Sequence, residues 1–173
     1  MWLRKALQLI VLFGAVSAAG WLLADDDEGE HRGRAFAAVS NAKWQAECSS
    51  CHMLYHPGLL PERSWRKLMS GLDKHFGENA GLDPATQKEI ASFLAKNSAD
   101  RSTSRRSARI AESIPPQAVP LRISETNWFH YRHGELHPDV FKRPKVGSPA
   151  NCIACHKGAE KGDFSEEGVR IPR

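Results

Sequence analysis

The sequence predicts an all-α protein organised as two lobes, and three observations support this prediction. First, apolar residues recur at helical spacing through the first half of the chain. Second, all four cysteines fall in two C-x-x-C-H motifs, CSSCH at residues 48–52 and CIACH at residues 152–156. Third, a proline-rich stretch at residues 114–120 lies between the motifs and favours extended chain. We therefore expect one lobe around each motif, the second less regular and richer in loops than the first.

The spacing within each motif has a chemical reason. Two thiols three residues apart reach both vinyl groups of one porphyrin and become thioethers, and the following histidine lies under the iron. Paired zinc-binding cysteines normally lie closer in sequence than these two motifs, and neither zinc nor disulfides explain the two histidines. The residues expected to hold two covalently bound haem c groups are Cys48, Cys51, Cys152 and Cys155, with His52 and His156 as proximal iron ligands.

The composition fits two small lobes and gives no support to a nucleic-acid partner. The 173 residues suffice for one ordinary domain or two small ones, and each porphyrin adds an apolar body to a thin core. The formal net charge is +4, from 24 Lys and Arg against 20 Asp and Glu. Haem propionates would offset this charge, and no pattern of basic and aromatic residues is present, so we expect no nucleic-acid binding.

The first 24 residues have the features of an export segment. Arg4 and Lys5 precede an uncharged run at residues 6–24, and four acidic residues follow it. Residues 1–24 are therefore interpreted as a signal peptide, although this run of 19 uncharged residues is also long enough to remain as an N-terminal membrane anchor. Both interpretations place the rest of the protein in the periplasm, where bacteria attach c-type haem.

Residues 33–98 form the expected first lobe, which begins with two helices. Phe36, Val39 and Trp44 have the approximate spacing of a helix that leads into the first motif. Ser64 would cap the second helix. The apolar face of this second helix would consist of Trp65, Leu68, Met69, Leu72 and Phe76.

The second iron ligand of the first haem should come from the end of this second helix. His75 lies at the edge of the apolar face, just before Gly77, and imidazole is the commonest metal donor in proteins. Met69, in the middle of the same face, is the alternative and would raise the reduction potential. His56 precedes a Pro-Gly turn, so we expect it at the surface or on the side of the haem propionates. A third helix, capped by Asp83, would then close the lobe.

Residues 99–120 form the expected linker between the lobes. The stretch is rich in serine and arginine at its start and in proline at its end. Such a composition is typical of a solvated connector, and the arginines could instead form a docking patch for an acidic partner. The expected boundary between the two haem lobes therefore lies here.

Residues 121–173 form the expected second lobe, in which the distal ligand must lie upstream of the motif. The histidines available before the motif are His130, His133 and His137. Their spacing within a short helical run favours His133 only slightly over His130 as the distal ligand. His137 lies at the end of the run. We expect the tail from residue 164 on to be a loop.

Taken together, these motifs resemble the bacterial dihaem cytochrome c family often called DHC. In the first lobe the matching residues are the C-x-x-C-H motif, Tyr55, residues 57–61, Ser64, Trp65, Met69 and residues 75–77. In the second lobe they are Thr126, Trp128, Phe129, His133, Glu135, Asn151 with the second motif, and residues 171–172. The resemblance covers most of the chain beyond the export segment.

The resemblance implies a cytochrome c-like N-terminal haem lobe, a loop-rich C-terminal haem lobe and two low-spin haems. On this basis His75 and His133 are the distal ligands. The resemblance also implies a low-potential electron carrier, not an enzyme, with redox partners such as a membrane cytochrome b and a small oxygen-binding haem protein. Two other functions would fit the motifs: a haem subunit of a membrane-bound oxidoreductase, and a haem enzyme or gas sensor with one open iron.

Overall fold

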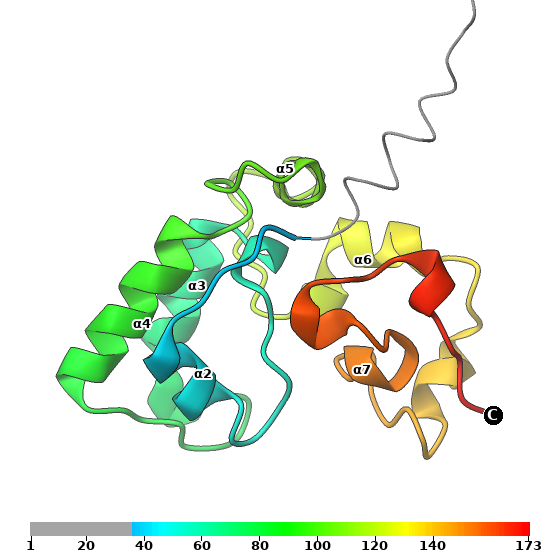
Figure 1. Cartoon of the computed structure of the whole chain (residues 1–173), viewed down its shortest axis with the longest axis horizontal. Helices are drawn as coiled ribbons and strands as arrows, with labels where there is room; N and C mark the ends of the chain where they lie inside the picture. The colour runs from blue at the N-terminus through cyan, green and yellow to red at the C-terminus, as the bar shows by residue number, and fades with distance from the viewer. Residues whose placement is uncertain (1–35) are drawn as a thin grey trace, which may run out of the picture.

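The computed structural model describes residues 36–173, and this part of the chain is helical, without a β-strand (Figure 1). The α-helices are α2 (Ala42–Cys48), α3 (Glu62–Met69), α4 (Pro84–Lys96), α5 (Arg105–Glu112), α6 (Asn127–Arg132) and α7 (Cys152–Cys155). Short 3-10 helices join them: η1 (Pro57–Leu59), η2 (Leu72–Lys74), η3 (Ile123–Glu125), η4 (Pro138–Lys142), η5 (Ala159–Lys161) and η6 (Glu166–Gly168). The all-α prediction is confirmed.

The predicted export segment, residues 1–24, lies outside the described residues. Within residues 36–173, no helix combines the length and the apolar character needed to cross a membrane.

Helices α2, α3 and α4 pack together on one side of the molecule around the first apolar core (Figure 1). α4 begins as predicted, because the Asp83 side chain accepts hydrogen bonds from the backbone N–H groups of Ala85 and Thr86, both at 3.0 Å. Pro84 occupies the first helical position, where a missing N–H costs nothing. The buried residues of this core are Trp44, Leu60, Trp65, Met69, Leu72, Ile90 and Leu94.

The helix before the first motif is shorter than predicted. α2 begins only at Ala42, where the Asn41 side chain accepts a hydrogen bond from the backbone N–H of Trp44 at 2.8 Å. Phe36 and Val39 therefore lie outside the helix. The expected helical spacing of these two residues was wrong, because an asparagine cap fixes the start of the helix three residues after Val39.

The second predicted helix starts earlier and ends earlier than expected. α3 begins at Glu62, so Ser64 lies within its first turn with a fully buried side chain and does not cap it. The helix ends at Met69, and the apolar pattern continues on the separate turn η2. The predicted continuous apolar face is therefore divided between two elements, and His75 follows the second of them.

The segment predicted as a solvated linker contributes to a second apolar core. It contains α5, which contacts η1 and lies above the other labelled helices in Figure 1. Ile110 and Ile114 are only 1% and 5% exposed, so the interpretation as a solvated connector was wrong. The buried residues of this second core are Phe36, Leu59, Ala99, Ile110 and Ile114.

Residues 121–173 form only short helices, which are joined by loops, as expected. Thr126 caps α6, since its Oγ1 accepts a hydrogen bond from the backbone N–H of Phe129 at 3.2 Å. The tail predicted as a loop contains the turn η6 and a bridge between His156 and Val169, which ties the tail to the second motif. The N-terminal segment also reaches this half, because the Phe36 N–H donates to the Gly162 carbonyl at 3.1 Å.

Candidate haem sites

The first C-x-x-C-H motif begins at the end of α2. Cys48 is the last residue of the helix, and the next N–H, that of Ser49, donates to the Gln45 carbonyl and closes it. Cys51 and His52 follow in an exposed turn. The second motif forms α7 itself, a single helical turn. None of the four cysteines forms a disulfide, so both motifs have the sulfur atoms needed for thioethers.

His75 faces His52 across the first site. The chain reverses immediately after His75, because Phe76 and Gly77 both have positive φ angles, of 54° and 106°. The ring centres of His52 and His75 are 6.2 Å apart, and the ring planes differ by 34°. A metal–imidazole bond is about 2 Å long, so two rings that ligate one metal from opposite sides have centres about 6 Å apart. This pair fits a single iron between the two rings.

The other candidates for the first site lie elsewhere. Met69 is a core residue of α3, only 6% exposed. His56 is 8% exposed, with Nε2 at 2.8 Å from the Ala37 carbonyl, while its Nδ1 accepts a hydrogen bond from the Gly58 N–H at 3.0 Å. The expectation that His56 lies at the surface was wrong: both of its ring nitrogens are engaged in fixing the chain around η1.

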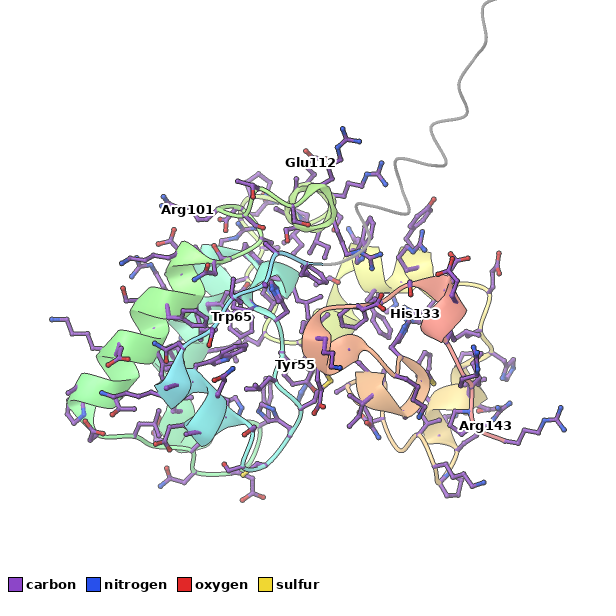
Figure 2. All side chains as sticks on the ribbon, viewed as in Figure 1. Tyr55, Trp65, Arg101, Glu112, His133 and Arg143 are labelled. Carbon is purple, nitrogen blue, oxygen red and sulfur yellow. The ribbon has the colours of Figure 1, made fainter. Side chains whose placement is uncertain are left out.

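His133 faces His156 across the second site. The ring of His133, which follows α6, stacks on Phe129 with centres 4.1 Å apart. Its ring centre lies 6.0 Å from that of His156, and the two planes are nearly perpendicular, at 85°. Figure 2 shows His133 in the half of the molecule that contains α6 and α7. The distance between the rings again fits one iron.

His130 and His137 do not share this position. Both are exposed. His137 instead caps η4, where its Nδ1 accepts a hydrogen bond from the Asp139 N–H at 3.3 Å and also lies 3.3 Å from the Asp139 carboxylate.

Backbone carbonyls orient two of the four facing histidines. His52 Nδ1 lies 2.7 Å from the Met53 carbonyl, and His133 Nδ1 lies 2.9 Å from the Phe129 carbonyl. An Nδ1–H that donates to a carbonyl leaves the Nε2 lone pair free for a metal and makes the imidazole a stronger donor. His156 Nδ1 differs, because it is buried without a hydrogen-bond partner among the described residues.

Burial favours the neutral form of three of these imidazoles. Burial lowers the pKa of His75, and the nearby His52 and Arg122 lower it further. Burial also lowers the pKa of His133, opposed only in part by the hydrogen bond to the Phe129 carbonyl. The pKa of His156 is lowered by burial and by His133. Since only a neutral imidazole has a lone pair to give, these shifts favour iron ligation.

Cys48, Cys152 and Cys155 lie in surroundings that disfavour a thiolate. Burial raises the pKa of Cys48, with a smaller effect from Glu47, and burial also raises the pKa of Cys155. Burial raises the pKa of Cys152 to about 11. Surroundings of low polarity oppose a charged sulfur but not a thioether, which is neutral. The residues of both sites therefore fit a covalently attached haem.

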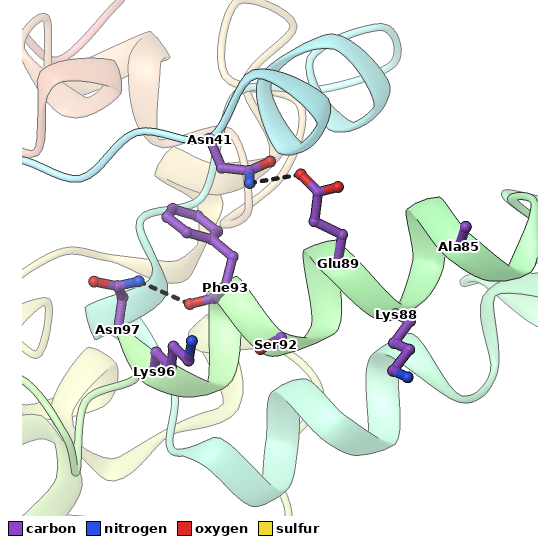
Figure 3. Close-up of a pocket in the computed structure, with 8 residues that line it drawn as sticks. All are labelled: Asn41, Ala85, Lys88, Glu89, Ser92, Phe93, Lys96 and Asn97. Carbon is purple, nitrogen blue, oxygen red and sulfur yellow. Dashed lines mark hydrogen bonds between the residues drawn. The ribbon is translucent and has the colours of Figure 1, made fainter.

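A surface pocket of about 530 Å³ lies away from both sites, on the outer face of α4 (Figure 3). Its lining includes Asn41, whose Nδ2 donates to Glu89 at 3.1 Å, and Asn97, whose Nδ2 donates to the Phe93 carbonyl at 2.8 Å. No cysteine or histidine of either motif lines it. The pocket is therefore not part of the redox site.

Tyr55 belongs to these sites, although the sequence patterns assigned no role to it. Its ring centre lies 5.1 Å from that of His52, and its hydroxyl donates to the Ala150 carbonyl at 2.8 Å. Its position three residues after the first motif was the only available signal, since no periodicity links Tyr55 to a residue 95 positions later.

Solved structures similar to this chain come from two bacteria. A dihaem cytochrome c from Rhodobacter sphaeroides is 44% identical, matches 73% of this chain and 98% of its own, and superposes with a TM-score of 0.65. The crystal structure of DHC purified from the same organism is 42% identical, over 74% of this chain and 100% of its own, with a TM-score of 0.60. A dihaem cytochrome c from Shewanella baltica OS155 is 37% identical over 78% of this chain and 95% of its own, with a TM-score of 0.62.

The match to a family model agrees with these structures. No curated protein matches the chain. The model of the dihaem cytochrome c family matches residues 44–164, a range that includes both C-x-x-C-H motifs and all four facing histidines. The chain therefore belongs to the dihaem cytochrome c family and carries two covalently bound haem c groups.

Proposed function

We propose that this protein is a periplasmic electron carrier of low potential in which two imidazoles ligate each iron. His52 and His75 would ligate the first iron, and His133 and His156 the second. The observation that supports this proposal is the distance between the rings in each pair, 6.2 Å and 6.0 Å. The thioethers would form at Cys48 and Cys51 for the first haem, and at Cys152 and Cys155 for the second.

The residues of the chain suit electron transfer better than substrate chemistry. Each haem, when bound, supplies a one-electron exchange between ferric and ferrous iron. With a histidine on each side, neither iron would have an open position, and hydrogen bonds to backbone carbonyls hold His52 and His133 in place. A site whose ligands do not move on reduction exchanges electrons with little reorganisation. Two imidazole ligands also give a lower potential than a histidine–methionine pair.

The proposed location and partners rest on the N-terminal sequence and the family resemblance. The uncharged run at residues 6–24 would direct the chain across the membrane, and it would tether the protein there if it is not cleaved. A carrier in the periplasm would exchange electrons between a membrane cytochrome b and a periplasmic partner such as a small haem protein. The mass of the mature protein decides between cleavage and an anchor.

Visible spectra with and without carbon monoxide test the ligation of both irons. In the wild-type protein both haems should be low-spin, and the gas should leave the reduced spectrum unchanged. His75→Ala and His133→Ala should each open one iron, so that half of the reduced haem binds the gas. His130→Ala, which removes an exposed histidine next to the second site, is the matched control and should behave as the wild type.

Binding of carbon monoxide by the wild-type protein would contradict the proposal. One iron would then be open or weakly ligated, and a haem enzyme or gas sensor would be the better interpretation. If instead His130→Ala opened an iron and His133→Ala did not, the electron-carrier function would stand with a different distal ligand.

A further inference from the structure

Tyr55 lies at the junction of the two halves of the protein. It is half-buried and packs against both apolar cores, the one formed by α2, α3 and α4 and the one that contains Phe36 and Ile110. Figure 2 shows Tyr55 between the two groups of helices. Few side chains of the described residues hold such a position, since only Tyr55 and Ile123 pack against both cores.

One end of Tyr55 touches the first haem site. Its ring centre is 5.1 Å from that of His52, and the two planes are inclined by 47°. Aromatic rings at this distance and inclination are in van der Waals contact. His52 is the proximal ligand of the first motif, so Tyr55 contacts the iron ligand itself.

The other end of Tyr55 reaches the second haem site through a single carbonyl. The Tyr55 hydroxyl donates to the Ala150 carbonyl at 2.8 Å. The same carbonyl accepts a hydrogen bond from the Cys152 N–H at 3.0 Å, and Cys152 Sγ lies 3.5 Å from it. Cys152 is the first attachment cysteine of the second haem. One side chain thus connects the ligand of one haem to the attachment point of the other.

The phenol suits a role that involves no proton transfer. Its hydroxyl donates to a backbone carbonyl, a group that accepts hydrogen bonds but does not take up a proton, so the direction of this hydrogen bond is fixed. The only other tyrosine in the chain, Tyr131, is 78% exposed.

We propose that Tyr55 positions the two haem sites for electron exchange with each other and forms the contact that connects them. One electron leaves a ferrous iron in one half and reduces a ferric iron in the other. No bond forms or breaks, no proton moves, and Tyr55 itself is neither oxidised nor reduced. This inference rests on the proposed function, because it requires both irons to be closed carriers.

The test measures exchange between the two haems within one molecule. Partly oxidised holoprotein is photoreduced by a short flash, and the redistribution of the electron between the haems is followed by absorbance. Tyr55→Phe keeps the ring against His52 but removes the hydrogen bond to Ala150, and Tyr55→Leu removes both contacts. Tyr131→Phe is the matched control, because it removes a tyrosine hydroxyl from the exposed surface.

The exchange rate should fall in the order wild type, Tyr55→Phe, Tyr55→Leu. Loss of the hydrogen bond to Ala150 should slow the exchange a few-fold in Tyr55→Phe, because the rate of electron transfer falls as the separation of the two haems grows. Tyr131→Phe should exchange at the wild-type rate. All three variants should keep low-spin spectra that carbon monoxide does not change, which shows that the ligands of each iron are intact.

Wild-type exchange rates in Tyr55→Phe and Tyr55→Leu would overturn the inference and leave the proposed function standing. If Tyr55→Leu failed to assemble with haem, Tyr55→Phe alone would decide, because it preserves the packing of the ring. An absence of exchange in the wild-type protein would also overturn the inference alone, whereas an iron opened to carbon monoxide would overturn the proposed function and the inference together.

Discussion

At the scale of single residues, His56 shows how a histidine next to a haem motif can be structural. Its Nε2 lies 2.8 Å from the Ala37 carbonyl, and its ring stacks on Phe36 with centres 4.6 Å apart. His56 therefore joins the N-terminal segment to η1. The sequence pattern predicted a surface residue because a Pro-Gly turn follows, but a turn can close over a buried side chain as well as project into solvent.

This burial predicts a pH dependence of stability. Burial lowers the pKa of His56 in the folded protein, so below the ordinary pKa of about 6.5 the unfolded chain binds more protons than the native one. The stabilisation from His56 is therefore fully present above about pH 6.5 and is lost as the pH falls towards the lower folded value. Denaturant unfolding of wild type and His56→Gln, followed by far-UV circular dichroism, should give free energies of unfolding that converge between pH 7.5 and 5.

The matched control for this measurement is His130→Gln, which removes an exposed imidazole. It should leave the free energy of unfolding within about 0.5 kcal/mol of the wild type. A difference between wild type and His56→Gln that stayed constant over the whole pH range would show that His56 does not bind its proton as inferred.

Ser64 allows a second test at this scale. A serine that caps a helix contributes about 1 kcal/mol, but Ser64 lies inside α3, and its buried hydroxyl has no hydrogen-bond partner in the described part of the chain. Ser64→Ala should therefore keep or raise the free energy of unfolding, by up to about 1 kcal/mol, because it removes a buried unsatisfied group. Asp83→Ala, which removes the cap of α4, should lower it by about 1 kcal/mol. Equal losses in the two variants would show that Ser64 has a partner.

Of the four facing histidines, the sequence motifs predict two, and spacing only favours the other two over their alternatives. Covalent attachment chemistry fixes the roles of His52 and His156, so the motifs alone predict them. Spacing could only favour His75 over Met69 and His133 over His130. The position of His75 depends on the turn at Phe76 and Gly77, and that of His133 depends on its stacking against Phe129. A periodic sequence pattern predicts neither feature.

At the scale of elements, helices with strong local signals were predicted and those stabilised by tertiary contacts were not. α4 has both an aspartate cap and a proline at its first position, and it begins where predicted. α5 has a sequence of arginines, serines and alanines, which looks like a solvated connector. Ser107 and Ile110 are the buried residues of α5. The helix packs against η1, which lies about fifty residues earlier in the chain, so no local sequence signal predicts this contact.

The contact between α5 and η1 requires a glycine. A Cβ atom on Gly58 would lie 2.9 Å from Phe36 Cδ1, 3.1 Å from His56 Nδ1 and in collision with Ser107 Oγ. Gly58→Ala should therefore lower the free energy of unfolding by about 1–3 kcal/mol, the usual cost of overpacking a core. Gly71→Ala is the control, because its nearest neighbour, the Lys67 carbonyl, would be 3.8 Å away.

Both variants can be measured by thermal unfolding of the holoprotein. Gly71→Ala should match or slightly exceed the wild type, since alanine reduces the freedom of the unfolded chain. If Gly58→Ala unfolded at the wild-type temperature, α5 could move away from η1 at little cost, and the second core would be less tightly packed than the structure indicates.

At the scale of the whole molecule, the two haem sites differ although their sequence motifs are equivalent. The first takes its facing histidine from a turn downstream of the motif, and the second takes it from a helix end upstream. The chain therefore enters the two sites in opposite directions. The ring planes also differ, since they meet at 34° in the first site and at 85° in the second.

This difference predicts two distinct electron paramagnetic resonance signals in the oxidised protein. The angle between the planes of two imidazole ligands affects the energies of the iron d orbitals. Nearly perpendicular imidazoles leave two iron d orbitals almost equal in energy, which gives a single very large g value. Rings closer to parallel separate these orbitals and give three well-resolved g values. The first site should therefore give the rhombic signal and the second the strongly anisotropic one.

A variant of Phe129 assigns the signals to their sites. The His133 ring stacks on Phe129 at 4.1 Å, so Phe129→Leu should let this ring rotate while its hydrogen bond to the backbone carbonyl of residue 129 keeps it on the iron. The strongly anisotropic signal should then shift or broaden, and the rhombic one should stay as in the wild type. Phe76→Leu is the reciprocal variant, because Phe76 packs on His75 with ring centres 4.8 Å apart. Two identical signals in the wild-type protein, or a change of both signals in either variant, would show that the ring planes in the holoprotein differ from those described here.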